Sequence, residues 1–296
     1  MNKISILGSD SFIATQFLAS LKNKEEARFF SRQASGKPNE MVKDLFEISH
    51  LDFQDSQLAI NFAAIVHQPK LKDEALYKRI NTDLPIHLAE EAKKAGVRHF
   101  IQMSTIAVYG DVELIDGSTP ENPLNVYGKT KWEADKALLA LQDESFKVSI
   151  IRPPMVYGGG KAPGNLQSLI KAALKGIPLP FKGVENKRDF IHVGNLIQAL
   201  HAVIENKLYG VIIPTDKKSV STWELITYID KYSDNKIRNI KIPGFIHTLI
   251  KMLKPKIYSK VFGDLQVVCT LPNEIYQPTF SMKDGIKEMV ESLNSL

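Results

Sequence analysis

A tyrosine and a lysine stand four residues apart in the segment Tyr127-Gly128-Lys129-Thr130-Lys131. Residues i and i+4 of a helix share one face, so these two side chains would lie side by side. A tyrosine that transfers protons near neutral pH needs its pKa lowered from ~10, and a neighbouring positive charge acts in that direction. Ser104 and Thr105 precede this helix and offer hydroxyls that could hold a carbonyl or an alcohol beside the tyrosine. We therefore predict proton transfer at an alcohol or a ketone.

A second candidate site follows the first apolar run of the chain, residues 4–7. Gly8 and Ala14 fit the first and third positions of a glycine-rich turn that binds a pyrophosphate at a helix N-terminus. Ser11 stands at the middle position, where it adds a side chain at the point of close approach. The turn lies between a strand-like run and a helical pattern, which is the setting that a dinucleotide site requires.

The elements that would position these residues alternate between strand and helix through the first half of the chain. We expect strands at residues 4–7, 28–30, 58–64, 99–103 and 148–152, with helices over 12–21, 86–94 and 126–141. Gly96 would end the second of these helices, because glycine readily adopts left-handed dihedrals. Such alternation predicts an α/β fold, a Rossmann-type doubly wound parallel sheet with right-handed crossovers.

The sequence pattern changes after Pro153-Pro154, where glycine and proline interrupt short helices. We place a smaller, loop-rich C-terminal substrate-binding lobe there, over residues 161–296. The dinucleotide-binding domain would cover residues 1–160, with returning segments near 188–215. Strand-like segments at 189–192 and 211–213 are expected to rejoin the main sheet.

Composition narrows the class of protein further. The chain has 296 residues, 44% hydrophobic and 24% charged, which is enough for a sizeable core. A single thiol, Cys269, excludes a disulfide framework, and the scattered histidines show no metal-ligand spacing, so no metal is predicted. No apolar run approaches the ~20 residues of a membrane span, and we expect a cytoplasmic protein. The net charge of +5 mildly favours an anionic ligand.

Seven motifs occur in a fixed order along the chain. They are the glycine turn from Gly8, Asn61-Phe62-Ala63-Ala64, Asn81-Thr82, Ser104-Thr105-Ile106-Ala107-Val108-Tyr109-Gly110, Tyr127-Gly128-Lys129-Thr130-Lys131, Arg152-Pro153-Pro154-Met155-Val156-Tyr157-Gly158 and Arg188-Asp189-Phe190-Ile191-His192-Val193. In this order they resemble the motifs of the extended short-chain dehydrogenase/reductase superfamily, specifically its NAD-dependent nucleotide-sugar epimerase/dehydratase group.

The resemblance implies roles for particular residues. Tyr127 would be the catalytic acid and base, Lys131 would bind the nicotinamide ribose and lower the tyrosine pKa, and Thr105 would be the catalytic hydroxyl. The implied substrate-binding residues are Ser104, Thr105, Asn165 and Arg188. Asn81 matches an asparagine that is structural or lies beside the cofactor. Together with Tyr127 and Lys131, the implied cofactor-binding residues are Gly8, Ser11, Phe12, Ile13, Asp44, Ala63, Ala64 and Asn81.

The cofactor could be NAD or NADP. The second expected strand ends in Phe30-Ser31-Arg32, without the acidic residue that usually holds the adenosine ribose of NAD. Ser31 and Arg32 could instead receive a 2′-phosphate, which favours NADP slightly.

Dehydratases of this group follow the catalytic threonine with an Asp-Glu pair. This chain has Ile106-Ala107 there, and neither side chain can move a proton, so 4,6-dehydration is not expected. Oxidation and reduction at one sugar carbon remain. We expect a 4-epimerase acting on a nucleotide-diphosphate sugar, with UDP implied by the family, and polysaccharide biosynthesis as its setting. An NADPH-dependent 4-ketoreductase is the alternative, followed by a non-catalytic dinucleotide-binding scaffold or sensor.

Residues 235–263 contain seven basic and no acidic residues, interleaved with apolar ones. Such a segment can lie on an anionic membrane. We expect instead a lobe helix whose apolar face packs inward, with membrane contact as the less favoured alternative. No nucleic-acid-binding module accompanies the charge. A homodimer is expected from the resemblance alone.

Overall fold

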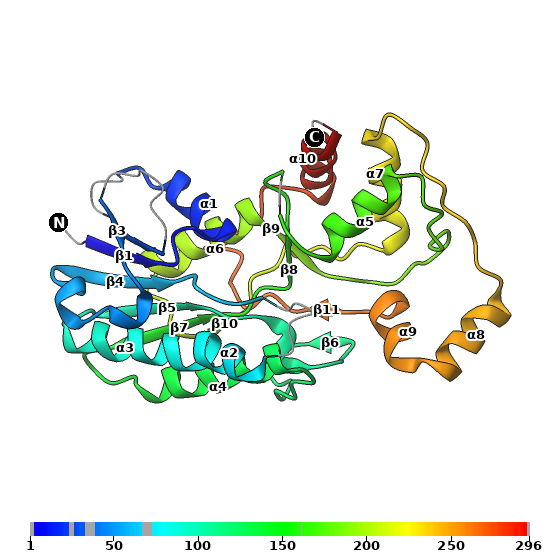
Figure 1. Cartoon of the computed structure of the whole chain (residues 1–296). Coiled ribbons are helices and arrows are strands. Elements are labelled where there is room, and N and C mark those ends of the chain that lie inside the picture. Colours follow the sequence, from blue (N-terminus) through cyan, green and yellow to red (C-terminus); the bar gives the residue numbers. More distant parts are fainter. Residues whose placement is uncertain (1–2, 24–26, 33–38, 67–72, 161, 295–296) are drawn as a thin grey trace. The chain divides into compact units, whose positions relative to one another are not determined.

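The computed structural model describes residues 3–23, 27–32, 39–66, 73–160 and 162–294 (Figure 1). The chain forms two compact units. The first contains Met1–Gly110, Pro120–Arg152 and Leu200–Ile212, and the second contains Asp111–Thr119, Pro153–Ala199 and Ile213–Leu296. The main division along the chain falls after Arg152, and short stretches on either side of it belong to the opposite unit.

A seven-stranded parallel sheet is the centre of the first unit. Its strands lie in the order β10-β7-β5-β4-β1-β2-β3, so the order reverses beside β1, as in dinucleotide-binding sheets. This confirms the predicted fold class. The strands are β1 (Lys3–Leu7), β2 (Ala27–Ser31), β3 (Glu40–Val42), β4 (Ser56–Asn61), β5 (His99–Met103), β7 (Lys147–Ile151) and β10 (Gly210–Ile212).

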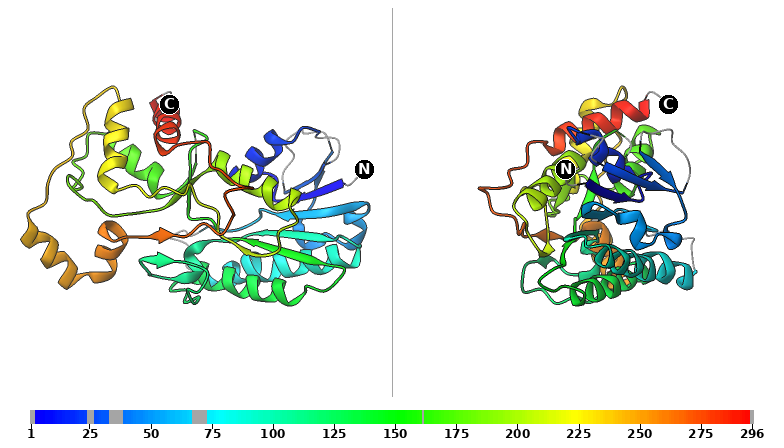
Figure 2. Two further views of the ribbon diagram at one scale, coloured as in Figure 1. Left: turned by 180° about the vertical axis from the view of Figure 1, so that it is seen from behind. Right: turned by 90° about the vertical axis from the view of Figure 1, so that its left-hand side faces the viewer.

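Helices cover both faces of this sheet (Figures 1 and 2). One face carries α1 (Phe12–Ser20) and the end of α6 (Val193–Glu205). The other carries α2 (Glu74–Lys78), a π-helical turn η4 (Arg79–Asp83), α3 (Leu84–Lys94) and α4 (Val126–Ala140). Three short 3₁₀ turns complete the unit, namely η2 (Leu45–Glu47), η3 (His50–Phe53) and η5 (Ile106–Tyr109).

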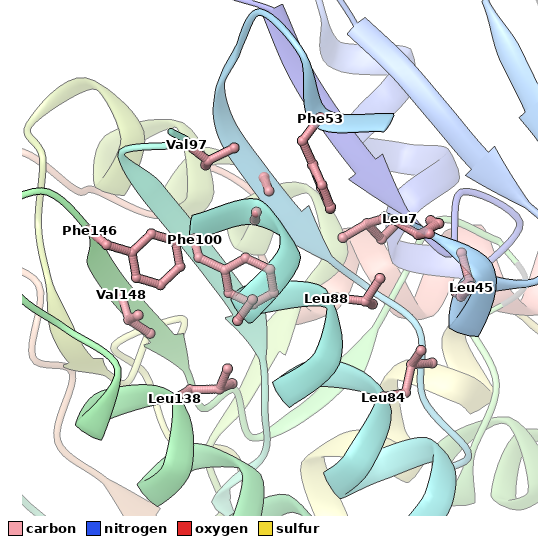
Figure 3. Close-up of a cluster of buried hydrophobic side chains, with 14 of the residues drawn as sticks. Leu7, Leu45, Phe53, Leu84, Leu88, Val97, Phe100, Leu138, Phe146 and Val148 are labelled. Atoms are coloured by element: carbon pink, nitrogen blue, oxygen red, sulfur yellow. The ribbon is translucent and has the colours of Figure 1, made fainter. Parts of the chain in front are cut away.

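The core of the first unit lies between the sheet and the α3–α4 layer (Figure 3). Leu88 of α3, Phe100 of β5 and Leu138 of α4 are fully buried in it, together with Phe146 and Val148. Burying an aliphatic or aromatic side chain of this size stabilises a fold by about 1.5–3 kcal/mol. The strands read as continuous apolar runs because helices cover both of their faces.

The second unit is assembled from small sheets and helices. Its strands form two parallel pairs, β8 (Met155–Tyr157) with β9 (Phe190–His192) and β6 (Leu114–Ile115) with β11 (Gln266–Val267). Its helices are the start of α6, α5 (Asn165–Leu174), α7 (Thr222–Tyr232), α8 (Gly244–Leu253), α9 (Pro255–Phe262) and α10 (Met282–Asn294).

Two expectations about the later segments need correction. The strand at residues 190–192 does not rejoin the main sheet, because it pairs with β8, whereas β10 does rejoin it beside β7. The apolar face of residues 244–253 does not pack inward, since none of the residues of α8 is buried. Within the described part of the chain, no helix is long and apolar enough to cross a membrane.

Candidate active site

The helix α4 begins at the predicted Tyr-Lys pair. The side chain of Asn125 caps it by accepting a hydrogen bond from the Gly128 N–H at 2.8 Å. An asparagine at this position satisfies one of the otherwise unpaired N–H groups of the first helical turn. The helical register then places Tyr127 and Lys131 on one face of α4, as predicted.

A glycine allows this helix to lie against the turn that follows β5. A Cβ on Gly128 would stand only 2.6 Å from the carbonyl oxygen of Ala107, so no larger residue fits without moving the backbone. From the other side, the Thr82 hydroxyl in the π-helical turn donates to the Thr130 carbonyl at 2.8 Å. These contacts seat the start of α4 beside Thr105.

Thr105 and Tyr127 are hydrogen-bonded through their hydroxyl groups, and this bond lowers the pKa of the tyrosine. Burial acts more strongly in the opposite direction and raises the pKa of Tyr127 to about 12, with a smaller contribution from the charge of Asp135. The Thr105 hydroxyl also accepts from the Ala107 N–H at 3.1 Å, which fixes its orientation. Among the described residues, therefore, Thr105 is the group that favours the phenolate.

Lys131 is fully buried, and its Nζ donates to the carbonyl oxygen of Met103 at 2.6 Å. Burial lowers its pKa to about 8, while the carboxylate of Asp135 acts in the opposite direction. At neutral pH Lys131 thus still carries its positive charge, one helical turn from Tyr127. The backbone contact anchors this charge to the end of β5.

Ser104 is buried, and its hydroxyl donates to Asp135 Oδ2 at 2.7 Å, so this hydroxyl already has a partner within the protein. Its contact with a substrate stays a prediction. Asp135 also accepts from Arg152 Nε at 3.0 Å, and Arg152 in turn pairs with Glu121 at 2.7 Å. Desolvation raises the pKa of Asp135, and the charges of Arg152 and Lys131 oppose that shift.

The predicted glycine turn joins β1 to α1. Gly8 has φ +72°, and a Cβ there would stand 2.7 Å from the Ala63 N atom, so the turn lies directly against the end of β4. Ser11 needs no glycine, because its φ is −70° and its hydroxyl caps α1 by accepting from the Ala14 N–H. Phe12 and Ile13 form the first turn of this helix.

Ser9 is a residue of this turn that the sequence analysis missed. Its hydroxyl is buried and has no hydrogen-bond partner among the described residues. A buried unpaired hydroxyl is costly, so a ligand that bonds to it gains affinity. With the tight glycine turn and the N-terminus of α1, this orphan hydroxyl fits a dinucleotide pyrophosphate. The signal for Ser9 in the sequence is its place inside the glycine turn.

The next expected cofactor residues follow β4. Asn81 is fully buried and uses both ends of its amide on the backbone of Ile65, at 2.9 Å each. It therefore supports the loop that contains Ala63 and Ala64, and its predicted place beside the cofactor stays a prediction. Asp44 is exposed, and its side chain caps η2 by accepting a hydrogen bond from the Phe46 N–H at 3.0 Å.

The end of β2 differs from expectation. Ser31 is 1% exposed, and its hydroxyl donates to Glu40 Oε1 at 2.9 Å. Glu40 begins the neighbouring strand β3, so a carboxylate stands beside β2 although β2 contains none. Arg32 follows the strand and is exposed. Of the two residues expected to receive a 2′-phosphate, Ser31 is thus already hydrogen-bonded to a carboxylate.

The expected substrate residues Asn165 and Arg188 belong to the second unit. Asn165 is the first residue of α5 and is exposed. Arg188 is partly buried, and its Nη1 donates to the carbonyl oxygen of Gly263 at 3.0 Å. Burial lowers the pKa of Arg188. The first unit therefore brings together Thr105, Tyr127 and Lys131. The expected substrate residues Asn165 and Arg188 both belong to the second unit.

Gly194 is the second residue of α6, which begins directly after β9. A Cβ on Gly194 would stand 2.5 Å from the ring of Phe280, so the missing side chain makes room for this aromatic residue. The Phe280 ring stacks on His192 at 4.6 Å, and His192 Nε2 lies 3.1 Å from Glu288. The junction between β9 and α6 is consequently well packed.

Comparison with known proteins establishes the class. The model of the NAD dependent epimerase/dehydratase family matches residues 4–212. This match spans the whole sheet of the first unit and the start of the second, and it contains Thr105, Tyr127 and Lys131. The chain belongs to this family of enzymes, which confirms the resemblance found in the sequence.

Three individual proteins are similar to this chain over most of its length. The chain is 29% identical to a UDP-glucose 4-epimerase of Vibrio cholerae, over 98% of this chain and 94% of that protein. It is 23% identical to the N-acetyl-alpha-D-glucosaminyl-diphospho-ditrans,octacis-undecaprenol 4-epimerase of Escherichia coli O157:H7, over 87% and 82%. Among solved structures, UDP-glucuronic acid 4-epimerase from Bacillus cereus in complex with NAD has a TM-score of 0.80 at 20% identity, over 99% and 97%.

Proposed function

We propose that this protein is an NAD-dependent nucleotide-sugar 4-epimerase. The observation that carries the proposal is the arrangement of Thr105, Tyr127 and Lys131 around the end of β5, in which a hydrogen-bonded hydroxyl pair stands one helical turn from a buried ammonium. The resemblance to two 4-epimerases over most of the chain supports it.

Each of these residues would have a separate task. Tyr127 would take the proton of the sugar hydroxyl at C4. It would return the proton after the sugar has rotated and presents the other face of its ring. Thr105 would hold the same oxygen through its hydroxyl, and its bond to the tyrosine favours the phenolate. Lys131 would contribute a fixed positive charge and a donor for a ribose hydroxyl. The bound NAD would supply the chemistry that these side chains lack, namely acceptance and return of a hydride.

The residues next to Thr105 speak against a dehydratase. Ile106 is buried, and Ala107 is held by its N–H to the Thr105 hydroxyl. Elimination of water from a sugar needs a general acid and a general base at the departing groups. Neither of these side chains can serve, so the reaction would stop at oxidation and reduction of one carbon.

The environment of β2 favours NAD over NADP, against the slight preference drawn from the sequence. A 2′-phosphate placed at the end of β2 would meet the Glu40 carboxylate, which is bonded to Ser31. Like charges in such proximity repel one another, and a carboxylate suits a ribose hydroxyl instead. The exposed Arg32 would then lie beside the adenosine without a phosphate to bind.

The sugar nucleotide would engage the second unit through Asn165 and Arg188. We propose UDP-linked sugars as the substrates, because the relative with the higher identity is a UDP-glucose 4-epimerase. A lipid-linked diphosphate sugar is a second candidate. It is favoured by the strongly exposed apolar residues Phe245 and Met252 on α8, which would suit a protein that works at a membrane surface.

The decisive experiment follows a deuterium label. Purified protein is incubated with UDP-glucose deuterated at C4, and the products are analysed by mass spectrometry and NMR. A 4-epimerase returns the same hydride, so UDP-galactose should form with the label retained and without net consumption of cofactor. The Tyr127→Phe variant should be at least ~100-fold slower, whereas Tyr209→Phe, which changes a half-exposed tyrosine of the first unit, should be unaffected.

Other outcomes would redirect or overturn the proposal. A protein that leaves this substrate unchanged but oxidises NADPH in the presence of a 4-keto sugar nucleotide would be a 4-ketoreductase. Interconversion of a polyprenyl-diphosphate-linked N-acetylglucosamine in detergent, without reaction of the UDP-sugar, would establish the lipid-linked substrate. A protein that binds neither NAD nor NADP would contradict both enzymatic proposals.

A further inference from the structure

The second unit carries a hairpin of two helices, α8 and α9 (Figures 1 and 2), and α8 exposes large apolar side chains. Phe245, Met252 and Leu253 of α8 are 73%, 72% and 66% exposed, and Leu249 is 47% exposed. Phe245, Leu249, Met252 and Leu253 follow the i, i+4, i+7, i+8 spacing of a single helix face. We call these four residues the apolar stripe. Scattered apolar residues on a surface are ordinary, but four on one face of a helix are not.

The opposite side of α8 is the side that packs. His247 lies opposite the stripe on the helix, and its ring contacts Tyr258 at 6.0 Å and Phe262 at 4.9 Å, both in α9. Tyr258 and Phe262 also contact each other at 5.1 Å. The hairpin therefore has an aromatic interior of its own, and α8 turns its most apolar face away from α9.

The segment that contains the stripe carries charge of one sign. Residues 235–263 contain seven Lys and Arg residues and no Asp or Glu. Lys241, Lys251 and Lys254 are exposed. Lys251 shares the face of His247, with its Nζ 5.9 Å from the centre of the Tyr258 ring, whereas Lys241 precedes α8 and Lys254 directly follows it. An apolar stripe with a lysine beyond each end of its helix matches a surface that combines hydrocarbon with negative charge, which is the interface of an anionic bilayer.

The charge also disfavours the competing occupants. A second copy of the hairpin packed stripe to stripe would bring two sets of lysines together without any carboxylate from this segment to offset them. A nucleic acid would match the lysines but would leave the apolar stripe without a partner. A lipid surface satisfies both features at once.

We propose that the α8–α9 hairpin docks this protein on anionic lipid membranes, with the apolar stripe inserted among the acyl chains and the lysines against the headgroups. The proposal concerns the second unit and does not depend on which sugar reacts. The hairpin is joined to a candidate substrate residue, because the carbonyl oxygen of Gly263, directly after α9, accepts from Arg188 at 3.0 Å and from Asn186 at 3.1 Å. Docking would therefore hold the loop of Arg188 at the membrane surface.

Flotation of the full-length protein with vesicles tests this. Vesicles of phosphatidylcholine alone are compared with vesicles containing 30% phosphatidylglycerol, at low and high NaCl. We expect binding to the anionic vesicles that weakens as salt rises, and little binding to the neutral ones. The double variant Phe245→Ser/Met252→Ser should bind at least about tenfold more weakly. The single variant Leu51→Ser removes an apolar residue that is 60% exposed in the first unit, and it should bind normally.

A second pair of variants keeps the test independent of the fold of α8. Lys241→Glu and Lys254→Glu change exposed residues just outside α8, and they should weaken binding to anionic vesicles and leave the melting temperature unchanged. The proposal is overturned if the wild-type protein does not bind anionic vesicles at low salt, or if the serine double variant binds as well as wild type. A dimer that dissociates in the serine variant, without vesicle binding by wild type, would instead assign the stripe to self-association.

Discussion

Lys131 gives the sharpest quantitative prediction, because a fully buried ammonium should reduce stability in measurable amount. Burial lowers its pKa from 10.5 to about 8. Each pKa unit corresponds to ~1.36 kcal/mol, so the protonated lysine costs the folded state about 3 kcal/mol at neutral pH. Lys131→Met removes that cost but leaves the Met103 carbonyl without its donor, which costs about 1–3 kcal/mol. We expect the variant to be up to about 2 kcal/mol more stable than wild type at pH 7, and inactive.

The pH dependence has a definite sign. Below pH 8 the lysine is protonated in both folded and unfolded chains, so the whole cost is present. Between pH 8 and 10.5 the unfolded chain binds more protons than the folded one, and the stability of the wild type therefore rises with pH. The methionine variant lacks this group. Its advantage should shrink through that window and change sign before its upper end, where only the cost of the unpaired Met103 carbonyl remains.

Urea denaturation monitored by circular dichroism at pH 7, 8, 9 and 10 measures the free energy of unfolding of both proteins. Lys129→Met is the matched control, since it makes the same substitution at an exposed position of the same helix and should show no pH-dependent difference from wild type. The reasoning is refuted if Lys131→Met is less stable at pH 7, or if its difference from wild type stays constant between pH 7 and 10.

Three further predictions concern the residues around this lysine. Gly128→Ala should lower kcat by at least about tenfold and destabilise the protein by about 1–3 kcal/mol, because its Cβ would lie 2.6 Å from the Ala107 carbonyl oxygen. Steady-state kinetics measures the change in kcat, and urea denaturation measures the change in stability. Thr105→Val should raise the pKa of Tyr127 beyond the present value of about 12, since it removes the hydrogen bond that lowers it; ultraviolet titration of the phenol near 295 nm, against the Tyr127→Phe background, would show one tyrosine ionising later. Glu40→Gln should increase the preference for NADP relative to NAD at least about fivefold by relieving charge repulsion; equilibrium binding of both cofactors tests it, and an unchanged ratio would exclude Glu40 from cofactor selection.

The parts of the fold that could be predicted are those set by local patterns. The strand β5 occupies the predicted residues, and α4 begins at the predicted residue, because continuous apolar runs and a polar cap mark such elements in the sequence. Gly96 has φ +82° just after α3, as its expected place at a helix end requires. The position of Tyr127 and Lys131 on one helix face could be predicted for the same reason, since the spacing of the two residues in a helix alone determines it.

The remaining features depend on contacts between distant residues. The strand β9 was expected as a strand, but its partner was not foreseen, because pairing with β8 joins segments 35 positions apart in register, such as Met155 with Phe190. Glu40 reaches Ser31 from a neighbouring strand. The amphipathic pattern of α8 gave the apolar face correctly, yet a pattern cannot tell which side of a helix its neighbours occupy.

The route of the chain between the two units has a consequence for how such a protein can diversify. Three separate stretches make up each unit, and the last strand of the large sheet, β10, is made only after much of the second unit. A hybrid gene with a single junction after Arg152 would join β7 of one parent to β10 of another, where Gly210 must pair with Ser149. The second unit of this architecture therefore cannot be exchanged as one cassette, and its residues have to change by substitution within an inherited frame.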